Sequence, residues 1–158
     1  IDMVEDFSRD FAVVVKNSLP ESLNTALLYE DSIVAVVRKG SQLAREKLTV
    51  GDLRGEPLIL YPSSAHSRAV IEEAFRRNGV VPTVGMEMHY PAAIVSLVEQ
   101  GMGVGLVSEL STREVLSRGT SVVPIEELRG VRRIGIATHR GRRLSPQARA
   151  LLEAIKAG

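Results

Sequence analysis

Short apolar runs rich in β-branched residues alternate along this chain with segments whose apolar residues recur at helical spacing. The alternation predicts strands at residues 11–15, 32–38, 58–61, 80–87, 104–107, 121–125 and 133–138, and helices at 67–78, 92–100, 111–118 and 146–156. Runs that are apolar throughout are typical of strands buried on both faces of a sheet. Strands and helices in alternation indicate an α/β fold with a largely parallel sheet.

Gly101, Gly103 and Gly105 form a glycine-rich stretch that invites a nucleotide-binding interpretation. The phosphate-binding fingerprint needs a strand before the glycines and a helix after them, whereas here the predicted helix comes first and the strand follows. The glycines are therefore predicted to end the helix and to let it pack closely against the sheet. No cofactor is expected.

The chain contains no cysteine, which excludes disulfides, thiolate catalysis and zinc–thiolate sites. Its three histidines, His66, His89 and His139, lack the i, i+4 spacing of a metal-binding pair, so no metal site is expected. Neither a Gly-x-Ser-x-Gly elbow nor a Gly-x-x-x-x-Gly-Lys-Ser/Thr phosphate loop occurs. The sequence therefore offers no constellation for catalysis, and the chain is not expected to be an enzyme.

The charges of the chain nearly cancel, with 20 basic against 19 acidic residues and a net charge of +1 at pH 7. Such a chain has no overall field to draw it onto nucleic acid. The arginines between Arg129 and Arg143 lack interleaved aromatic residues, so we expect them to be solvated surface rather than a nucleic-acid contact. The longest apolar runs fall well short of the ~20 residues that a membrane-spanning helix needs, and no membrane contact is expected.

The most informative motif is Ser63-Ser64-Ala65-His66-Ser67, at the junction between a predicted strand and a predicted helix. Hydroxyls and free backbone N–H groups at a helix start form a neutral pocket for an anion, strengthened by the positive end of the helix dipole. Alternatively, Ser64 or Ser67 only caps the helix, and the sequence favours neither interpretation. His89-Tyr90-Pro91 forms a second such junction, and ligands of open α/β sheets bind outside the carboxyl ends of the strands.

Several stretches in combination closely resemble the effector-binding domain of LysR-type transcriptional regulators. They are Asp52-Leu53-Arg54-Gly55-Glu56-Pro57-Leu58-Ile59, then Ser67-Arg68 with Ile71-Glu72-Glu73-Ala74-Phe75 and Gly79, and then the run from Ala93 to Val107. Asp10-Phe11-Ala12-Val13-Val14 resembles the strand at the end of that family's first lobe segment, and Leu144-Ser145-Pro146 resembles the start of its last helix. The resemblance covers essentially the whole chain.

The resemblance implies an α/β, two-lobed fold of the type II periplasmic-binding-protein-like class, with the first lobe incomplete. Residues 32–38 and 133–138 would be the two crossing strands, and the effector would be held between the lobes. Residues 1–35 would be a remnant of lobe I, residues 36–134 lobe II, and residues 135–158 a C-terminal segment returning to lobe I. The implied effector-binding residues are Ser63, Ser64, His66, Ser67, His89 and Tyr90 from lobe II, with Lys16 and Asn17 from lobe I.

The predicted function is to sense a small anionic effector, without catalysis, for a LysR-type DNA-binding regulator. The expected partners are that effector, further copies of the chain in a homodimer or tetramer, and operator DNA only through a helix-turn-helix preceding this sequence. The main alternative is a free solute-binding protein of the same fold, which would normally carry a secretory signal. The first residues lack such a signal, and this favours a regulator in the cytoplasm. A third alternative is an enzyme with the same two-lobed fold, since a fold does not fix a function. It would need a nucleophile, a base or a metal site, and the sequence offers none.

Overall fold

The chain divides into two compact units in the computed structural model, which describes residues 4, 8–15, 21–141 and 143–157. Unit 1 takes in the described residues of Ile1–Glu30 and Arg132–Gly158, and unit 2 is Asp31–Val131. Unit 1 is therefore built from two segments far apart in the sequence, whereas unit 2 is one continuous stretch.

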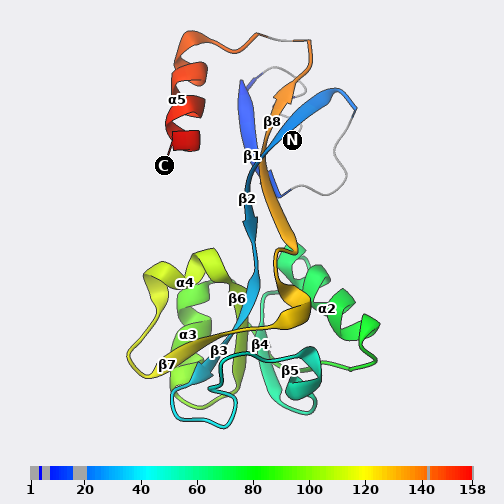
Figure 1. Cartoon of the computed structure of the whole chain (residues 1–158), viewed down its shortest axis with the longest axis vertical. Helices are drawn as coiled ribbons and strands as arrows, with labels where there is room; N and C mark the ends of the chain where they lie inside the picture. Colours follow the sequence, from blue (N-terminus) through cyan, green and yellow to red (C-terminus); the bar gives the residue numbers. More distant parts are fainter. Residues whose placement is uncertain (1–3, 5–7, 16–20, 142, 158) are drawn as a thin grey trace. The chain divides into compact units, whose positions relative to one another are not determined.

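Unit 2 is built on a five-stranded sheet with the strand order β5-β4-β6-β3-β7 (Figure 1). The strands are β3 (Ile33–Arg38), β4 (Pro57–Leu60), β5 (Thr83–Glu87), β6 (Val104–Ser108) and β7 (Thr120–Pro124). Strand β4 pairs in parallel with β5 and β6, but β3 pairs antiparallel with both β6 and β7. Four of the five strands therefore run in one direction and β3 runs opposite to them, so the sheet of unit 2 is mixed, and the expectation of a largely parallel sheet fails at β3.

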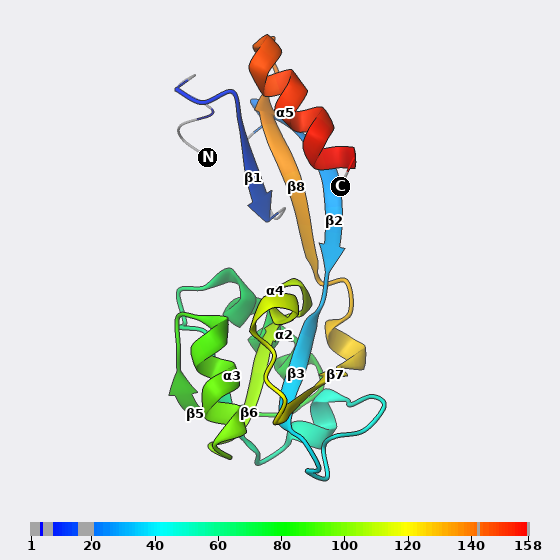
Figure 2. The same ribbon diagram turned by 90° about the vertical axis from the view of Figure 1, so that its left-hand side faces the viewer.

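Helices cover both faces of this sheet (Figures 1 and 2). The elements are α2 (His66–Arg77) with the 3-10 turns η1 (Val50–Leu53) and η2 (Glu126–Leu128) on one side, and α3 (Pro91–Glu99) with α4 (Glu109–Val115) on the other. Alternate residues of β3 divide between the sides: Ile33, Ala35 and Val37 pack in the cluster that contains α2, and Val34 and Val36 in the cluster that contains α3. This strand is buried on both faces, as its apolar run predicts.

The glycine-rich stretch after α3 has the structural role that the sequence predicts. Gly101 adopts a φ of 79° directly after the helix, and its N–H donates to the Val98 carbonyl at 2.9 Å. A Cβ at Gly105 would lie 2.5 Å from Cγ2 of Ile94 on α3. Only glycine therefore lets α3 approach β6 this closely, which confirms the prediction of close helix–sheet packing.

Unit 1 contains a three-stranded sheet in the order β1-β8-β2 and the C-terminal helix α5 (Pro146–Ala157). The strands are β1 (Phe11–Val15), β2 (Leu23–Asp31) and β8 (Arg132–His139). Strands β1 and β8 pair antiparallel, from Phe11 opposite Thr138 to Val15 opposite Ile134. Helix α5 begins as the sequence predicts, because the Ser145 hydroxyl accepts the N–H of Ala148 at 3.1 Å and proline occupies the first helical position.

Strand β2 was not expected from the sequence. It begins and ends with buried residues, Leu23 and Asp31, but Leu27 and Tyr29 between them are 45% and 40% exposed. Residues 32–38, expected as a crossing strand, form β3 in the interior of the unit 2 sheet, and residues 133–138 belong to β8 in unit 1.

Candidate functional site

The junction between β4 and α2 holds four of the predicted effector-binding residues. After β4 the chain turns at Pro62, whose carbonyl accepts the N–H of Ala65 at 2.9 Å, and α2 begins at His66. The N-cap residue is Ala65, and α2 has no side-chain cap hydrogen bond. The interpretation of Ser64 or Ser67 as a helix cap is therefore wrong. The helix begins at His66, so Ser67 lies inside its first turn.

The side chains of this junction differ in their exposure. Ser63 and Ser64 are exposed, His66 is half-buried, and Ser67 is buried, with 9% of its surface exposed. Within the described part of the chain, the hydroxyls of Ser63, Ser64 and Ser67 make no hydrogen bond to protein. Each serine hydroxyl can donate one hydrogen bond, so this helix start retains neutral donors.

The junction between β5 and α3 lies at the same edge of the unit 2 sheet. The register pairs Leu60 with Glu87, and the N–H of Met88 donates to the Leu60 carbonyl at 2.8 Å. His89 and Tyr90 follow, both exposed, with their ring centroids 6.5 Å apart. Tyr90 is the N-cap of α3 and forms no side-chain cap hydrogen bond. The structure thus brings two uncapped helix starts to neighbouring parallel strands, at their carboxyl ends.

Arg68 ties these two junctions together. Its guanidinium donates to Glu72 of α2 at 2.7 Å, to Glu87 of β5 at 2.7 Å and to the carbonyl of Tyr61, directly after β4, at 2.9 Å. Only 8% of the Arg68 side chain is exposed. Burial acts to lower the pKa of Arg68, but the hydrogen bonds that it donates to Glu87 and Glu72 outweigh burial, and the pKa is raised. Arg68 therefore stays charged, with its donors directed at the protein itself.

The third junction at this edge, from β6 to α4, is occupied by a carboxylate of the chain. Asp31 is fully buried, and its Oδ2 accepts the hydroxyl of Ser108, the N-cap residue of α4, at 2.6 Å. Its Oδ1 accepts the N–H of Leu110 at 3.2 Å. The dipole and the unpaired N–H groups of a helix start favour a negative charge, which Asp31 supplies here.

Two predicted effector-binding residues and the third histidine remain to be placed. Lys16 and Asn17 lie outside the described residues. His139 belongs to unit 1, where its Nδ1 accepts the N–H of Gly141 at 3.0 Å. In the part of the chain that the structure describes, no three histidine, aspartate or glutamate side chains converge as metal ligands.

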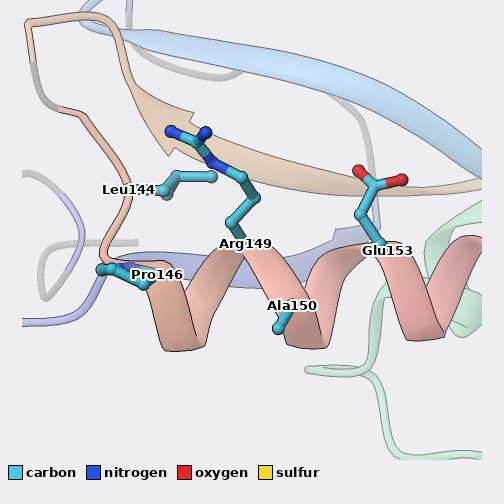
Figure 3. Close-up of a pocket in the computed structure, with 5 residues that line it drawn as sticks. All are labelled: Leu144, Pro146, Arg149, Ala150 and Glu153. Atoms are coloured by element: carbon cyan, nitrogen blue, oxygen red, sulfur yellow. The ribbon is translucent and has the colours of Figure 1, made fainter.

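Surface pockets of the described residues lie away from the two junctions, and two of them illustrate this. One, of about 410 Å³, opens beside α5 in unit 1 and is lined by Leu144, Pro146, Arg149, Ala150 and Glu153 (Figure 3). The other, of about 330 Å³, lies in unit 2 and is lined by Ser32, Ile33, Val34, Glu109, Pro124, Ile125 and Arg129. In Figure 3, Arg149 and Glu153 point to the same side of α5, so this pocket pairs opposite charges beside one helix. Neither pocket includes a residue of the α2 or α3 junction.

In open α/β sheets, ligands bind outside the carboxyl ends of the strands, which is where the starts of α2 and α3 lie. The whole chain, residues 1–158, matches the family described as LysR substrate binding domain, and it belongs to that family. Its fold is that of LysR effector-binding domains, in the type II periplasmic-binding-protein-like class. In the described part of the chain, no helix is both long and apolar enough to cross a membrane.

Relatives and solved structures agree with this assignment. The transcriptional dual regulator GltC of Bacillus subtilis (strain 168) is 29% identical over 152 residues, which cover 94% of this chain and 51% of GltC. The chain thus spans about half the length of this relative. The Synechocystis PCC6803 CcmR regulatory domain, solved in complex with 2-PG, has a TM-score of 0.84 at 22% identity, covering 99% of this chain and 76% of that one. The BenM effector binding domain, solved with its effector benzoate, has a TM-score of 0.82 at 22% identity, covering 99% and 72%.

Proposed function

We propose that this chain senses a small anionic effector for a LysR-type DNA-binding transcriptional regulator, without catalysing a reaction. The observation that carries the proposal is the pair of neighbouring helix starts, α2 and α3, that no side chain caps. The first N–H groups of a helix have no partner within it, and together with the positive end of the dipole they favour an anion.

The proposed donors surround the start of α2. Ser64 and Ser67 offer hydroxyls, His66 an imidazole, and His89 and Tyr90 stand at the neighbouring helix start. Ser63, together with Lys16 and Asn17 outside the described residues, completes the proposed set. Hydroxyl, imidazole and backbone N–H groups suit a carboxylate, which accepts several hydrogen bonds at once.

The relatives support the proposal at the level of the domain. The CcmR regulatory domain was solved with 2-PG and the BenM domain with benzoate, so this fold accommodates small ligands in both. The names of the relatives are those of transcription regulators. We propose that the complete protein acts in the cytoplasm as a homo-oligomer, and that it contacts operator DNA through a helix-turn-helix outside this sequence.

The test is calorimetry on the complete regulator with a panel of small carboxylates and phosphates, repeated on the double variant Ser64→Ala, His66→Ala. Losing hydrogen bonds to a charged ligand should weaken binding roughly tenfold or more. In the single variant Ser64→Ala the free energy of unfolding should change by less than about 0.5 kcal/mol, because the Ser64 side chain is exposed and caps nothing. Ser41→Ala, an exposed serine after β3, is the matched control. Unchanged affinity in the double variant would move the effector site elsewhere.

A further inference from the structure

The pocket of about 330 Å³ in unit 2 is lined by residues at the start of β3 and at the ends of its two neighbouring strands. In the sheet, β3 lies between β6 and β7 and runs antiparallel to both. The register places Ile33 of β3 opposite Ser108, the last residue of β6. It places Val34 opposite Pro124, the last residue of β7. The segments that follow β6 and β7 therefore flank the first residues of β3.

These two flanking segments bring opposite charges to the pocket. Glu109 directly follows β6, and Arg129 follows β7 after the turn η2. Both residues are exposed, and within the part of the chain that the structure describes neither side chain forms a hydrogen bond or an ion pair. Glu126, also on η2, accepts its hydrogen bond from Lys47 and not from Arg129. A carboxylate and a guanidinium therefore line one pocket without pairing with each other.

Ser32 anchors the backbone on both sides of the pocket. Its carbonyl accepts the N–H of Glu109 at 2.9 Å. Its hydroxyl accepts the N–H of Gly130, the residue after Arg129, at 3.2 Å. Ile33, which also lines the pocket, is fully buried in the core. Two strand spacings, about 10 Å, separate β6 from β7, so the sheet fixes the gap between the two charge-bearing segments.

We propose that this pocket binds a small zwitterion such as an α-amino acid. The guanidinium of Arg129 can donate two parallel hydrogen bonds to the ligand carboxylate, and Glu109 can accept hydrogen bonds from the ligand ammonium group. Pro124, which is half-buried, offers an apolar surface to the side chain of the ligand. The volume lies within the range of small-molecule sites.

The charge pattern favours a zwitterion over an ion of one sign. A simple anion would be attracted by Arg129 but repelled by Glu109, and a simple cation would meet the reverse. A zwitterion gains from both residues. The inference does not depend on the proposed effector site, because none of the residues of this pocket belongs to the α2 or α3 junction.

The test is a titration of the isotope-labelled chain with L-valine, with isovalerate and with isobutylamine, at about pH 7.5 and constant ionic strength. Isovalerate is valine without its ammonium group, and isobutylamine is valine without its carboxylate. The amide signals of Ser32, Glu109 and Gly130 report binding at the pocket. Because both charged residues are exposed, the dissociation constant of valine should be on the order of 1–10 mM, and each analogue should bind about two- to fivefold more weakly.

Two variants assign the contacts. Glu109→Gln should weaken the binding of valine about two- to fivefold without weakening that of isovalerate. Arg129→Gln should weaken valine by a similar factor without weakening isobutylamine. Glu114→Gln and Arg118→Gln are the matched controls, because both residues are exposed and neither lines the pocket, and they should leave all three dissociation constants unchanged.

The wild-type comparison of the three compounds decides the proposal even if a variant does not fold. Saturable shifts with valine bound more tightly than both analogues support it. Equal affinities for valine and one analogue overturn the assignment to a zwitterion, because a site for a single charge would then account for the binding. Absence of a saturable response to valine at about 100 mM, roughly ten times the weakest dissociation constant expected, overturns the pocket as a binding site.

Discussion

The starts of α2 and α4 follow neighbouring elements of one sheet, yet they are completed in opposite ways. At α4 the buried carboxylate of Asp31 accepts the Ser108 hydroxyl and the N–H of Leu110. At α2 the N-cap residue is Ala65, which offers no acceptor, and Ser63 and Ser64 beside it are exposed. The protein satisfies one helix start from within and leaves the other to solvent.

This difference separates stability from binding within a single edge of unit 2. A helix start with a built-in carboxylate stabilises the fold, because its unpaired donors are satisfied in the absence of any ligand. An uncapped start forgoes that stabilisation, and its donors remain available to an external anion. Mutations that remove the carboxylate at α4, or that add one at α2, test whether the first helix start serves stability and the second serves binding.

The largest effect is expected at the occupied start. Asp31→Ala removes the acceptor of the Ser108 hydroxyl and the Leu110 N–H in a buried place, and it should lower the free energy of unfolding by about 2–3 kcal/mol, measured by urea denaturation. Glu30→Ala is the control, because the Glu30 side chain is 56% exposed and its pair with Arg133 spans 3.5 Å; it should cost less than about 0.5 kcal/mol. Equal costs for the two variants would mean that Asp31 does not stabilise α4.

The second effect concerns the framework of the uncapped start. Arg68→Met keeps an apolar stem but removes the donors to Glu72, Glu87 and Tyr61. It should lower the free energy of unfolding by about 2 kcal/mol, because the guanidinium is buried while its two acidic partners are half-exposed. Arg76→Met changes an arginine whose side chain is 72% exposed, and it should cost less than about 0.5 kcal/mol. Urea denaturation of both variants measures this difference. If Arg68→Met lowers the free energy of unfolding as little as Arg76→Met does, the hydrogen bonds of Arg68 do not stabilise this edge.

The third prediction converts the uncapped start into an occupied one. Ala65→Asp places a carboxylate at the N-cap of α2, where the backbone is already extended, with φ −79° and ψ 137°. It should raise the free energy of unfolding by about 1 kcal/mol. It should also abolish the binding of acetate at this helix start, followed by the amide signal of Ser67 in a titration, because the new side chain takes the position of the anion. A stabilised variant that still binds acetate there would separate the site from the helix start.

The sequence predicts most elements of this fold, since helical spacing and apolar runs are local signals. Eleven predicted segments correspond to strands or helices of the structure, with ends shifted by a few residues. Strand β2 was not predicted, because Leu27 and Tyr29 are exposed and its apolar and polar residues do not alternate cleanly. A strand is visible in a sequence when burial on one face gives an alternating pattern, or when burial on both faces gives a continuous apolar run.

The residues that organise the site were harder to foresee. The pair of Arg68 and Glu72 follows the i, i+4 rule of helices and is visible in the sequence. The contact of Arg68 with Glu87 spans 19 residues, and that of Asp31 with Ser108 spans 77. Both depend on how strands are ordered in the sheet, which no local pattern records. Serines near a helix start were recognised, but whether they cap it depends on the residue at which the helix begins.

The smallest effect is expected at a second carboxylate-capped start, that of η1. Asp52 Oδ2 accepts the backbone N–H of Thr49 at 2.8 Å and its hydroxyl at 2.7 Å, while Asp52 Oδ1 lies 3.2 Å from Arg45. The backbone and side-chain hydrogen bonds from Thr49 hold the pKa of Asp52 below its usual 3.8. Burial opposes this shift, and Arg45 adds to it.

A carboxylate whose pKa is lowered by folding stabilises the protein fully above its unfolded pKa, and the contribution is lost as the pH falls through the folded pKa. The difference in unfolding free energy between the wild type and Asp52→Asn should therefore be constant above about pH 5 and shrink below 3.8. Thr49→Val removes the hydroxyl but keeps the backbone donor, so the pKa of Asp52, followed by its side-chain carbon resonance, should move part of the way back toward 3.8. A stability difference that does not change between pH 2 and pH 7, a range of about five units around that value, would show that the Asp52 charge contributes nothing to the start of η1.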